Sequence, residues 1–337
     1  MQSNSINPVL SVGPVPLDGR AILAPMSGIT DAGLRRIARR FGASLVVSEM
    51  VASDELARGK AEAQLRAEGS GVDPHVVQLA GCQPHWLAEA AKVAEGAGAS
   101  VIDINMGCPS KRVIGGYAGS HLMRDLDQAL RLIEATVAAT SLPVTVKMRL
   151  GWDDDSHNAP ELARRAEQAG VRLVTVHGRT RCQFYKGAAN WSAIRAVKAA
   201  VSIPVVANGD CNGLDDARAM LEASGADAVM VGRAATGRPW LVGQIARGLA
   251  GEAAAAPSLE ARRDAALEHY DSLLAAYGTK VGVRHARKHM LGYAEDAAGA
   301  AGVPASLRTR LATGDDPRDV VAALRAVYDM ADLEQAA

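Results

Sequence analysis

Short apolar runs rich in Val, Ile and Leu alternate with longer Ala- and Leu-rich segments over most of the chain. Eight runs have the length and composition of buried β-strands: Ala21–Ala24, Leu45–Ser48, Val76–Leu79, Val101–Asn105, Val144–Met148, Leu173–His177, Pro204–Ala207 and Ala228–Val231. The segments between them carry apolar residues at helical spacing and predict helices: Asp31–Phe41, Asp54–Lys60, Pro84–Gly96, Asp125–Thr140, Ala159–Ala169, Trp191–Ala200, Leu214–Ala223 and Pro239–Leu249. The chain therefore repeats a strand–helix unit eight times.

The predicted strands are nearly continuous in apolar residues, which is typical of strands buried on both faces of a parallel sheet. Start and stop signals support the helices, because Asp31 can cap the first one and Gly42 can end it. Eight such units predict an α/β fold of the (β/α)8 TIM-barrel type. A doubly wound open sheet is the alternative, but no G-x-G-x-x-G motif follows the first strand.

The pattern changes after Leu249. Residues 251–258 (GEAAAAPS) read as a linker, and no convincing strand follows them. Helices are predicted at Leu259–Ala276, His285–Ala297, Pro304–Leu311 and Val320–Leu333. We therefore expect a barrel over residues 1–250, a linker over 251–258 and a small all-helical C-terminal domain over 259–337.

The composition fits a folded protein without a membrane segment. Hydrophobic residues make up 48% and charged residues 22%, which excludes disorder. Lys and Arg balance Asp and Glu at 37 each, so bulk charge does not indicate a nucleic-acid partner, although a local basic patch is allowed. No apolar run reaches the roughly 18 residues of a membrane span. The start, MQSNSINPVLSVGPV, has no secretory pattern, and we expect a cytoplasmic protein.

The cysteines and acidic runs predict neither a metal site nor a disulfide framework. Cys82, Cys108, Cys182 and Cys211 lie far apart and form no C-x-x-C pair. The acidic run at 153–155 has no partner ligands at metal spacing and reads as a solvated loop. A reducing compartment is consistent with this cysteine usage.

Polar residues and turn glycines follow the carboxyl end of every predicted strand. In a TIM barrel these ends meet at the rim that carries the active site. A purely structural barrel would not need them, so the pattern favours an enzyme. The residues in question are Pro25-Met26, Glu49, Gln78, Asn105, Lys147 with Arg149, His177 with Arg179, Asn208-Gly209-Asp210 and Gly232-Arg233.

The loops after strands seven and eight predict a phosphate site. They contain Asn208-Gly209-Asp210 and Gly232-Arg233, and TIM barrels commonly bind phosphate at these two loops. Their glycines would let backbone N–H groups approach an anion, and a helix starting near Pro239 would add its N-terminal dipole. One such loop alone would more simply be an ordinary turn, but both lie at the expected place.

Lys147 lies within a buried strand, where an unpaired Lys is rare. At the barrel mouth its charge would suit a flavin, whose reduced ring carries negative charge near N1. Gln78 and Asn105 could bind the ring edge. A solvated strand end is the alternative, but Arg149 lies two residues on and faces the same side of the strand.

Cys108 follows the fourth strand in Asn105-Met106-Gly107-Cys108-Pro109-Ser110. A thiol with its ordinary pKa of about 8.5 stays protonated at neutral pH and can act as a general acid. His177 ends the sixth strand, where a ligand contact is favoured over a purely structural role. Arg179 beside it could meet a phosphate.

These motifs together resemble the tRNA-dihydrouridine synthases, flavoenzymes that reduce uridine to dihydrouridine in tRNA. The resemblance spans nearly the whole chain and is nearest to the bacterial B branch, the NifR3-like group. It rests on Ala24-Pro25-Met26, Ser48-Glu49-Met50, Val77-Gln78-Leu79-Ala80-Gly81, Asp103-Ile104-Asn105-Met106-Gly107-Cys108-Pro109, Val146-Lys147-Met148-Arg149, His177-Gly178-Arg179-Thr180, Asn208-Gly209-Asp210 and Val231-Gly232-Arg233.

The resemblance implies FMN on the rim and NADPH as the reductant. It implies that the flavin delivers a hydride to C6 of a D-loop uridine and that Cys108 protonates C5. Asn105, Arg149 and Arg179 would face the substrate. The positions that match FMN-binding residues are Ala24, Pro25, Met26, Gln78, Lys147, His177, Asn208, Gly209, Asp210, Gly232 and Arg233.

By the same resemblance, the helical domain would bind tRNA. Arg284, Arg287 and Lys288 share one helical face by their spacing, which gives a local phosphate-binding patch. An exposed solvated face is the alternative for the patch alone. Two rival functions are a dihydroorotate dehydrogenase-like enzyme acting on a free pyrimidine, and a non-catalytic RNA-binding protein that kept the scaffold.

Overall fold

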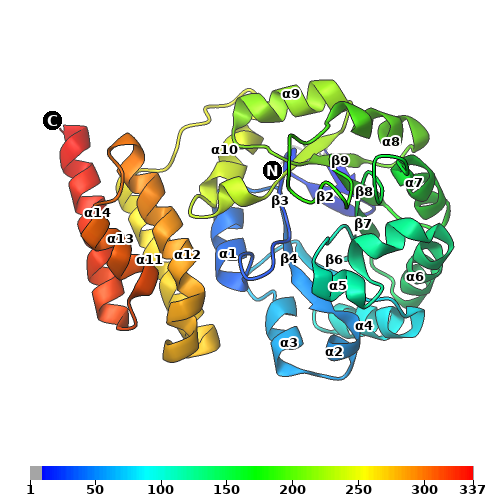
Figure 1. Ribbon diagram of the computed structural model, residues 1–337, viewed down its shortest axis with the longest axis horizontal. Coiled ribbons are helices and arrows are strands. Elements are labelled where there is room, and N and C mark those ends of the chain that lie inside the picture. Colours follow the sequence, from blue (N-terminus) through cyan, green and yellow to red (C-terminus); the bar gives the residue numbers. More distant parts are fainter. Residues whose placement is uncertain (1–9, 337) are drawn as a thin grey trace, which may run out of the picture.

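A closed barrel of eight parallel strands forms the centre of the molecule in a computed structural model, which describes residues 10–336. Each strand pairs with its neighbours in chain order, and β10 closes the ring against β3. The TIM-barrel prediction is confirmed, with helices ringing the sheet (Figure 1). The strands are β3 (Ala21–Leu23), β4 (Leu45–Ala52), β5 (His75–Ala80), β6 (Val101–Met106), β7 (Val144–Arg149), β8 (Leu173–His177), β9 (Val205–Asn208) and β10 (Ala228–Val231).

The helices around the barrel agree with the predicted ones to within a few residues at their ends. They are α1 (Ala32–Arg40), α2 (Ser53–Ala57), α4 (Pro84–Gly96), α6 (Leu126–Ala139), α7 (Ala159–Gln168), α8 (Arg195–Ala200, after the short 3-10 helix η2, Ser192–Ile194), α9 (Leu214–Ser224) and α10 (Trp240–Leu249). Four short helices were not predicted, because each is too brief to show a period: α3 (Ala61–Ala67), α5 (Lys111–Gly115), η1 (Gly119–Arg124) and η3 (Arg233–Ala235).

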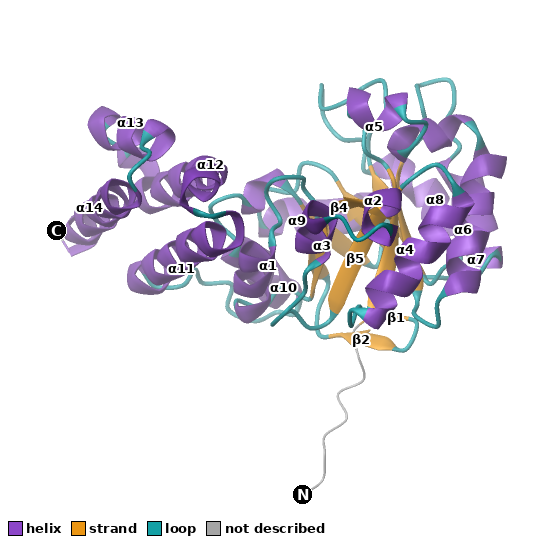
Figure 2. Cartoon of the chain, turned by 90° about the horizontal axis from the view of Figure 1, so that it is seen from below, coloured by secondary structure: helices purple, strands orange, loops and turns teal. Residues whose placement is uncertain are grey.

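A hairpin that the sequence did not reveal closes the amino-terminal end of the barrel. Strands β1 (Leu10–Val12) and β2 (Val15–Leu17) pair antiparallel. Figure 2 shows them beneath the barrel, at the opposite end from α5. Leu10, Val12 and Leu17 pack with the first inward-facing residues of the strands, so this end is a dry apolar plug.

The inward-facing residues change character along each strand. Successive side chains alternate between the two faces of a strand, and the first inward residues, such as Val76, Val101 and Leu173, belong to the apolar plug. The inward residues farther along are Gln78, Asp103, Asn105 and Lys147. One end of the barrel is therefore polar, and it is the end that the carboxyl ends of the strands form.

The C-terminal residues form a group of helices beside the barrel, as predicted (Figure 1). These are α11 (Leu259–Tyr277), α12 (Thr279–Ala298), the short 3-10 helix η4 (Gly299–Ala301), α13 (Ala305–Thr313) and α14 (Pro317–Ala336). No helix or strand lies between Leu249 and Leu259, where the linker was predicted. Ile37 of α1 and Trp240 of α10 belong to the apolar core of these helices, so the barrel is joined to them by packing. The division into domains stays a prediction.

A buried polar cluster also joins the two parts. His269 of α11 places Nε2 3.0 Å from Asp31 Oδ2, and its Nδ1 lies 3.0 Å from the Tyr293 hydroxyl. His289 of α12 lies 4.0 Å from the same carboxylate. Among residues 10–336, this is the one cluster whose ligand atoms, all within 4.8 Å of one another, could hold a metal ion. Asp31 also accepts a hydrogen bond from Leu34 N–H at the start of α1, so it serves the barrel and the helices together.

Burial and the charge of His269 shift the pKa values of Asp31 and His289. Burial raises the pKa of Asp31, but the charge and hydrogen bond of His269 outweigh it and hold that pKa well below its usual range. Burial and the charge of His269 lower the pKa of His289 to about 3. His289 is therefore neutral at physiological pH.

No helix between residues 10 and 336 combines the length and the apolar composition that a bilayer crossing requires. The segment examined for a secretory pattern falls mostly on residues 1–9, which lie outside the described part of the chain.

The first prediction concerns the pH dependence of stability. In the unfolded chain His289 takes up a proton below about pH 6.5, whereas in the folded protein it does so only near pH 3. The unfolded state thus binds more protons between these values, and the free energy of unfolding falls by up to ~1.4 kcal/mol per pH unit as the pH decreases. Urea titrations of H289Q between pH 6.5 and 4.5 should show a shallower dependence than wild type. The exposed H157Q is the matched control, and equal slopes in H289Q and wild type would contradict the assignment.

Candidate active site at the barrel mouth

The polar end of the barrel gathers most of the residues that the sequence singled out. Strand pairing places Gln78 beside Asp103, Asn105 beside Lys147, and His177 beside Asn208. Cys108 lies directly beyond β6 on the loop that leads to α5. The mouth therefore combines amides, one ammonium, one imidazole and one thiol.

Lys147 carries its charge into the mouth. Its Nζ donates to Asn208 Oδ1 at 3.0 Å, and Asn208 Nδ2 donates to the Met230 carbonyl at 2.9 Å. Burial, and next the charge of Arg149, lower the pKa of Lys147 to about 8. The ammonium is thus charged at neutral pH but poorly solvated, which favours contact with an anionic or strongly polar ligand group.

A chain of hydrogen bonds links the neighbouring amides to a buried carboxylate. Gln78 Nε2 donates to Asp103 Oδ2 at 2.7 Å, and Asn105 Nδ2 donates to Gln78 Oε1 at 2.8 Å. Thr145 Oγ1 donates to the other oxygen of Asp103 at 2.6 Å. Burial raises the pKa of Asp103, and these two donors act against it.

Cys108 is held by its backbone on both sides. Its N–H donates to Asn105 Oδ1 at 2.9 Å, and its carbonyl accepts from Ser120 N–H at 3.0 Å and from Ser120 Oγ at 2.9 Å. Burial raises the pKa of the thiol above its ordinary value. Cys108 is therefore protonated at neutral pH, which suits a proton donor rather than a thiolate nucleophile.

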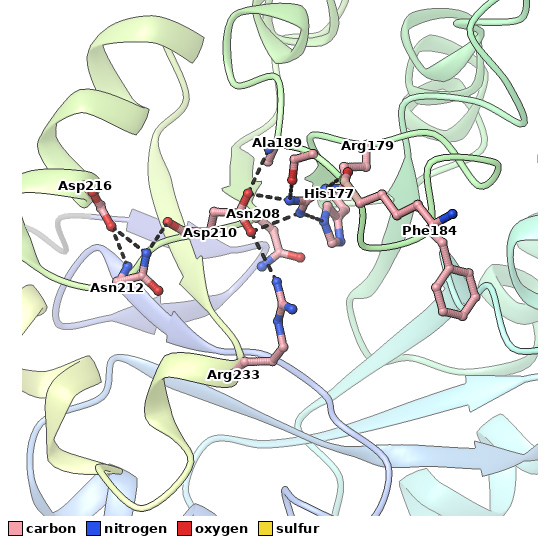
Figure 3. Close-up of polar contacts among 12 residues, drawn as sticks. His177, Arg179, Phe184, Ala189, Asn208, Asp210, Asn212, Asp216 and Arg233 are labelled. Carbon is pink, nitrogen blue, oxygen red and sulfur yellow. Dashed lines mark hydrogen bonds and ion pairs between the residues drawn. The ribbon is translucent and has the colours of Figure 1, made fainter. Parts of the chain in front are cut away.

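An ion-paired group borders the mouth after β8, β9 and β10 (Figure 3). Asp210 accepts from Arg179 Nη1 at 3.0 Å and Nη2 at 2.5 Å, from Arg233 Nη2 at 3.2 Å and from Ala189 N–H at 2.8 Å. Burial raises the pKa of Asp210, but the bond from Arg179 and the other donors lower it overall. Asp210 thus anchors Arg179 and leaves Arg233, whose side chain is 66% exposed, at the rim.

His177 lies beside this group as a neutral imidazole. Its Nε2 is 3.3 Å from Arg179 Nη1. Burial, followed by the positive charges of Lys147, Arg149 and Arg179, lowers its pKa well below the ordinary value. His177 can therefore donate or accept a hydrogen bond at the mouth without adding charge.

Arg149 and Arg179, which were expected to face a substrate, are buried and bound to groups of the protein, and their role toward a substrate stays a prediction. Arg149 is 1% exposed and donates at 2.8 Å to the carbonyls of Gly107, Thr180 and Phe184. Arg179 is 2% exposed and is bound to Asp210 and to the carbonyls of Lys186 and Gly187. Both brace loops of the mouth. The sequence could not show this, because the spacing of the two arginines does not reveal the carbonyls and the Asp210 carboxylate that they bind.

The two loops expected to bind phosphate lie side by side after β9 and β10. Gly209 has φ +124°, and a Cβ there would come within 2.7 Å of the Ala189 Cβ, so only glycine fits. A Cβ at Gly232 would make ordinary van der Waals contact with the Met26 sulfur at 3.7 Å and the Ala24 Cβ at 3.8 Å, so this glycine faces the loop after β3. Ala24 and Pro25 precede Met26 on the adjacent loop after β3.

The helix expected to add its dipole begins as predicted, because Pro239 is the N-cap of α10. The first turn after β10 is η3. The turn before α10 packs against α12, since a Cβ at Gly237 would lie 2.1 Å from the backbone of Gly292. That the helix near Pro239 serves the phosphate site stays a prediction.

The basic residues of α12 separate into two orientations. Lys288 points toward the loop after β3, because a Cβ at Gly28 would lie 3.0 Å from its Nζ. Arg284 is exposed one turn before it. Arg287 turns elsewhere and binds the Thr313 carbonyl at 3.0 Å and Asp315 at 2.8 Å. The helical spacing placed the three on one face, but it could not show that Asp315 engages Arg287.

Two features of the mouth were not singled out from the sequence. Asp103 and Thr145 belong to the inner face, and the alternation in Val101–Asn105 already places Asp103 on the same side as Asn105. Tyr185 is 47% exposed and lies between the guanidinium groups of Arg149 and Arg233, at 5.5 and 5.3 Å from its ring centre. No short motif signals it, because it lies on a long loop.

Comparison with known proteins places the chain within one family. The family model described as "Dihydrouridine synthase (Dus)" matches residues 22–331. The chain is 54% identical over 315 residues to a "Probable tRNA-dihydrouridine synthase" of Rhizobium leguminosarum bv. phaseoli, covering 94% of this chain and 97% of the relative. It is 48% identical over 289 residues to "tRNA-dihydrouridine synthase B" of Xanthomonas axonopodis pv. citri, covering 85% and 87%.

Solved structures agree in fold at low sequence identity. A 2-naphthoyl-CoA reductase matches with a TM-score of 0.54 at 14% identity, over 72% of this chain and 52% of its own. Morphinone reductase matches with a TM-score of 0.51 at 15% identity, over 75% and 91%. The barrel scaffold is therefore shared with other proteins, whereas the matched family model and the close relatives establish that this chain belongs to the dihydrouridine synthase (Dus) family.

Proposed function

We propose that this chain reduces uridine to 5,6-dihydrouridine in the D-loop of tRNA, with FMN as its bound flavin and NADPH as the reductant. The observation that carries the proposal is the arrangement of the mouth. A desolvated Lys147 and the amides of Gln78 and Asn105 lie beside a protonated Cys108. The names of the close relatives support the same substrate.

The donor set fits FMN. The ring edge needs hydrogen-bond partners and a cation near N1, and Gln78, Lys147 and His177 can supply them. The phosphate needs glycine backbone and positive charge, which the Gly209 and Gly232 loops and the rim Arg233 provide. Pro25 and Met26 lie on the adjoining loop, where Met26 comes closest to Gly232.

The flavin, when bound, supplies the hydride that it takes from NADPH. Hydride addition at C6 of the uracil leaves an enolate-like charge on the base, and C5 must then gain a proton. Cys108 holds that proton at neutral pH because burial raises its pKa. The short loop fixed by Asn105 and Ser120 keeps the thiol in place.

The uridine must leave its stack to reach the mouth, at a cost of a few kcal/mol. Other contacts with the RNA must offset this cost. Lys288 and Arg284 supply positive charge beside the mouth from α12, as a phosphate backbone requires.

The decisive assay is dihydrouridine formation by the purified, FMN-loaded protein. The substrate is bulk tRNA from cells that lack this modification, with NADPH, and the product is mapped by position. Product at a D-loop uridine supports the proposal. A flavin that NADPH reduces without product from tRNA, together with turnover of a free pyrimidine, would overturn it in favour of a dihydroorotate dehydrogenase-like activity.

Cys108 provides the sharpest single substitution. C108A should lower dihydrouridine formation by about 10²–10⁴-fold, the usual contribution of a general acid. Reduction of the flavin by NADPH should stay at the wild-type rate, because that half-reaction needs no proton from Cys108. Stopped-flow absorbance and tRNA turnover measure the two steps separately. C211A, which removes another thiol of the barrel, is the matched control, and unchanged tRNA turnover in C108A would exclude the thiol as donor.

Lys147 gives a pH-dependent prediction. Its pKa is lowered to about 8, so the apoprotein should bind FMN more weakly as the pH rises through about 8 and the ammonium loses its charge. K147M should bind FMN about 10- to 100-fold more weakly at pH 7, the worth of a charge-assisted hydrogen bond. Its affinity should also lack the pH dependence. Fluorescence titration of FMN from pH 6.5 to 9.5 tests both, and identical profiles in wild type and K147M would contradict the role.

Because Lys288 points toward the loop after β3 and Arg287 is bound to Asp315, their substitutions should affect tRNA binding differently. K288A should raise the KM for tRNA and reduce its salt dependence, because one phosphate contact is lost. R287A should affect the KM less, since that guanidinium is already bound to Asp315. Flavin reduction by NADPH should be unchanged in both. Steady-state kinetics at several salt concentrations measure this, and a larger effect of R287A than of K288A would refute the assignment.

A further inference from the structure

We propose that Asp103 is a positioning residue that fixes the direction of the hydrogen-bond chain running from the barrel interior through Gln78 and Asn105 to the backbone of Cys108. Asp103 lies on the inner face of β6, one layer below Asn105, and is 4% exposed. It does not approach Cys108 itself. No role for it follows from the proposed chemistry alone.

The direction follows from the chemistry of the first group. An ionised carboxylate can only accept hydrogen bonds, so Gln78 must turn its NH₂ toward Asp103, where Nε2 lies 2.7 Å from Oδ2. The carbonyl oxygen of Gln78 then faces Asn105 and accepts from Nδ2 at 2.8 Å. This leaves Asn105 Oδ1 as the acceptor for the N–H groups of Gly107 at 3.1 Å and Cys108 at 2.9 Å.

Each link would be lost if an amide reversed. A flipped Gln78 would direct its oxygen at the Asp103 carboxylate and its NH₂ at the NH₂ of Asn105. A flipped Asn105 would direct its NH₂ at two backbone N–H groups. Both arrangements leave buried donors and acceptors unsatisfied, at about 1–3 kcal/mol each, so Asp103 sets one orientation for the whole chain.

Burial raises the pKa of Asp103, and two surrounding groups act against this effect. Thr145 donates to Oδ1 from the neighbouring strand at 2.6 Å, so both oxygens have a donor. The positive charge of Lys147 acts in the same sense and lowers the pKa of Asp103 against the effect of burial. The carboxylate also helps to balance the Lys147 charge inside the barrel.

The consequence for chemistry rests on the proposed function, in which Cys108 donates the proton. Among the described contacts, Asn105 alone connects the hydrogen-bond chain from Asp103 to the Cys108 loop. Its Oδ1 accepts from the N–H groups of Gly107 and Cys108. With its amide fixed, the loop stays in one conformation and the thiol keeps one position. The same orientation sets which polar atoms of Gln78 and Asn105 remain for the flavin and the base.

The test compares three variants by hydrogen exchange of the Gly107 and Cys108 amides, with and without saturating FMN. D103L keeps the shape but removes the acceptor, and about tenfold faster exchange is expected, the worth of one lost hydrogen bond. D103N should retain slow exchange, because its oxygen can face Gln78 while its NH₂ donates to the Thr145 hydroxyl. T145V, the matched control, removes a bond to the same carboxylate but leaves Gln78 oriented, and its exchange should stay near wild type.

Three results would overturn the proposal. These are wild-type exchange in a folded D103L, equal acceleration in T145V and D103L, or amides in the wild-type protein that exchange as fast as an unstructured peptide. The last result is informative even where D103L does not fold. The exchange readout needs no tRNA, so a protein with the expected pattern that makes no dihydrouridine would refute the proposed function while supporting the role of Asp103.

Discussion

The buried ammonium of Lys147 in the barrel mouth influences the pKa values of the titratable groups around it. Lys147 is desolvated enough to lower its pKa to about 8, and its direct partner is the neutral amide of Asn208. With burial, its charge lowers the pKa of His177, and it acts against the burial that raises the pKa of Asp103. The Lys147 ammonium thus has a neutral amide as its direct partner, whereas Arg179 and Arg233 pair with Asp210 and Arg149 binds backbone carbonyls.

The apolar plug at the opposite end of the barrel supplies the packing that stabilises a barrel with polar groups in its mouth. Leu10, Val12 and Leu17 fill the amino-terminal end together with the first inward residues of the strands, and the polar inward residues lie nearer the carboxyl ends of the strands. The barrel thus divides its interior by depth: packing stabilises the lower layers, and hydrogen bonds order the upper one. This division explains why Asp103, at the boundary between the two, is both buried and fully hydrogen-bonded.

The strands, the main helices and the rim residues could be predicted because their signals are local. The alternation of side chains within a strand is visible in its own sequence. Because barrel active sites lie at the carboxyl ends of the strands, the residues that end each strand can be predicted to form the site. The remainder depends on partners distant in sequence. Asp210 meets Arg179 31 residues away, Asp315 meets Arg287 28 residues away, and Asp31 meets His269 238 residues away. Nothing in the spacing of Arg149 or Arg287 reveals that their donors are already used.

The contacts between the barrel and helices α11–α14 fix the position of Lys288 relative to the loop after β3. His289 is fixed at the Asp31 cluster, and its neighbour Lys288 therefore projects at the loop after β3, beside Gly28. Gly28 N–H in turn donates to the buried Glu49 at 2.5 Å, so the loop that carries Pro25 and Met26 is held from below by the barrel and from above by α12. An RNA that binds Lys288 as proposed would therefore lie beside the loop that borders the proposed flavin site. In the proposed function, the placement of the substrate and that of the cofactor would both depend on the contacts of Asp31 and Glu49.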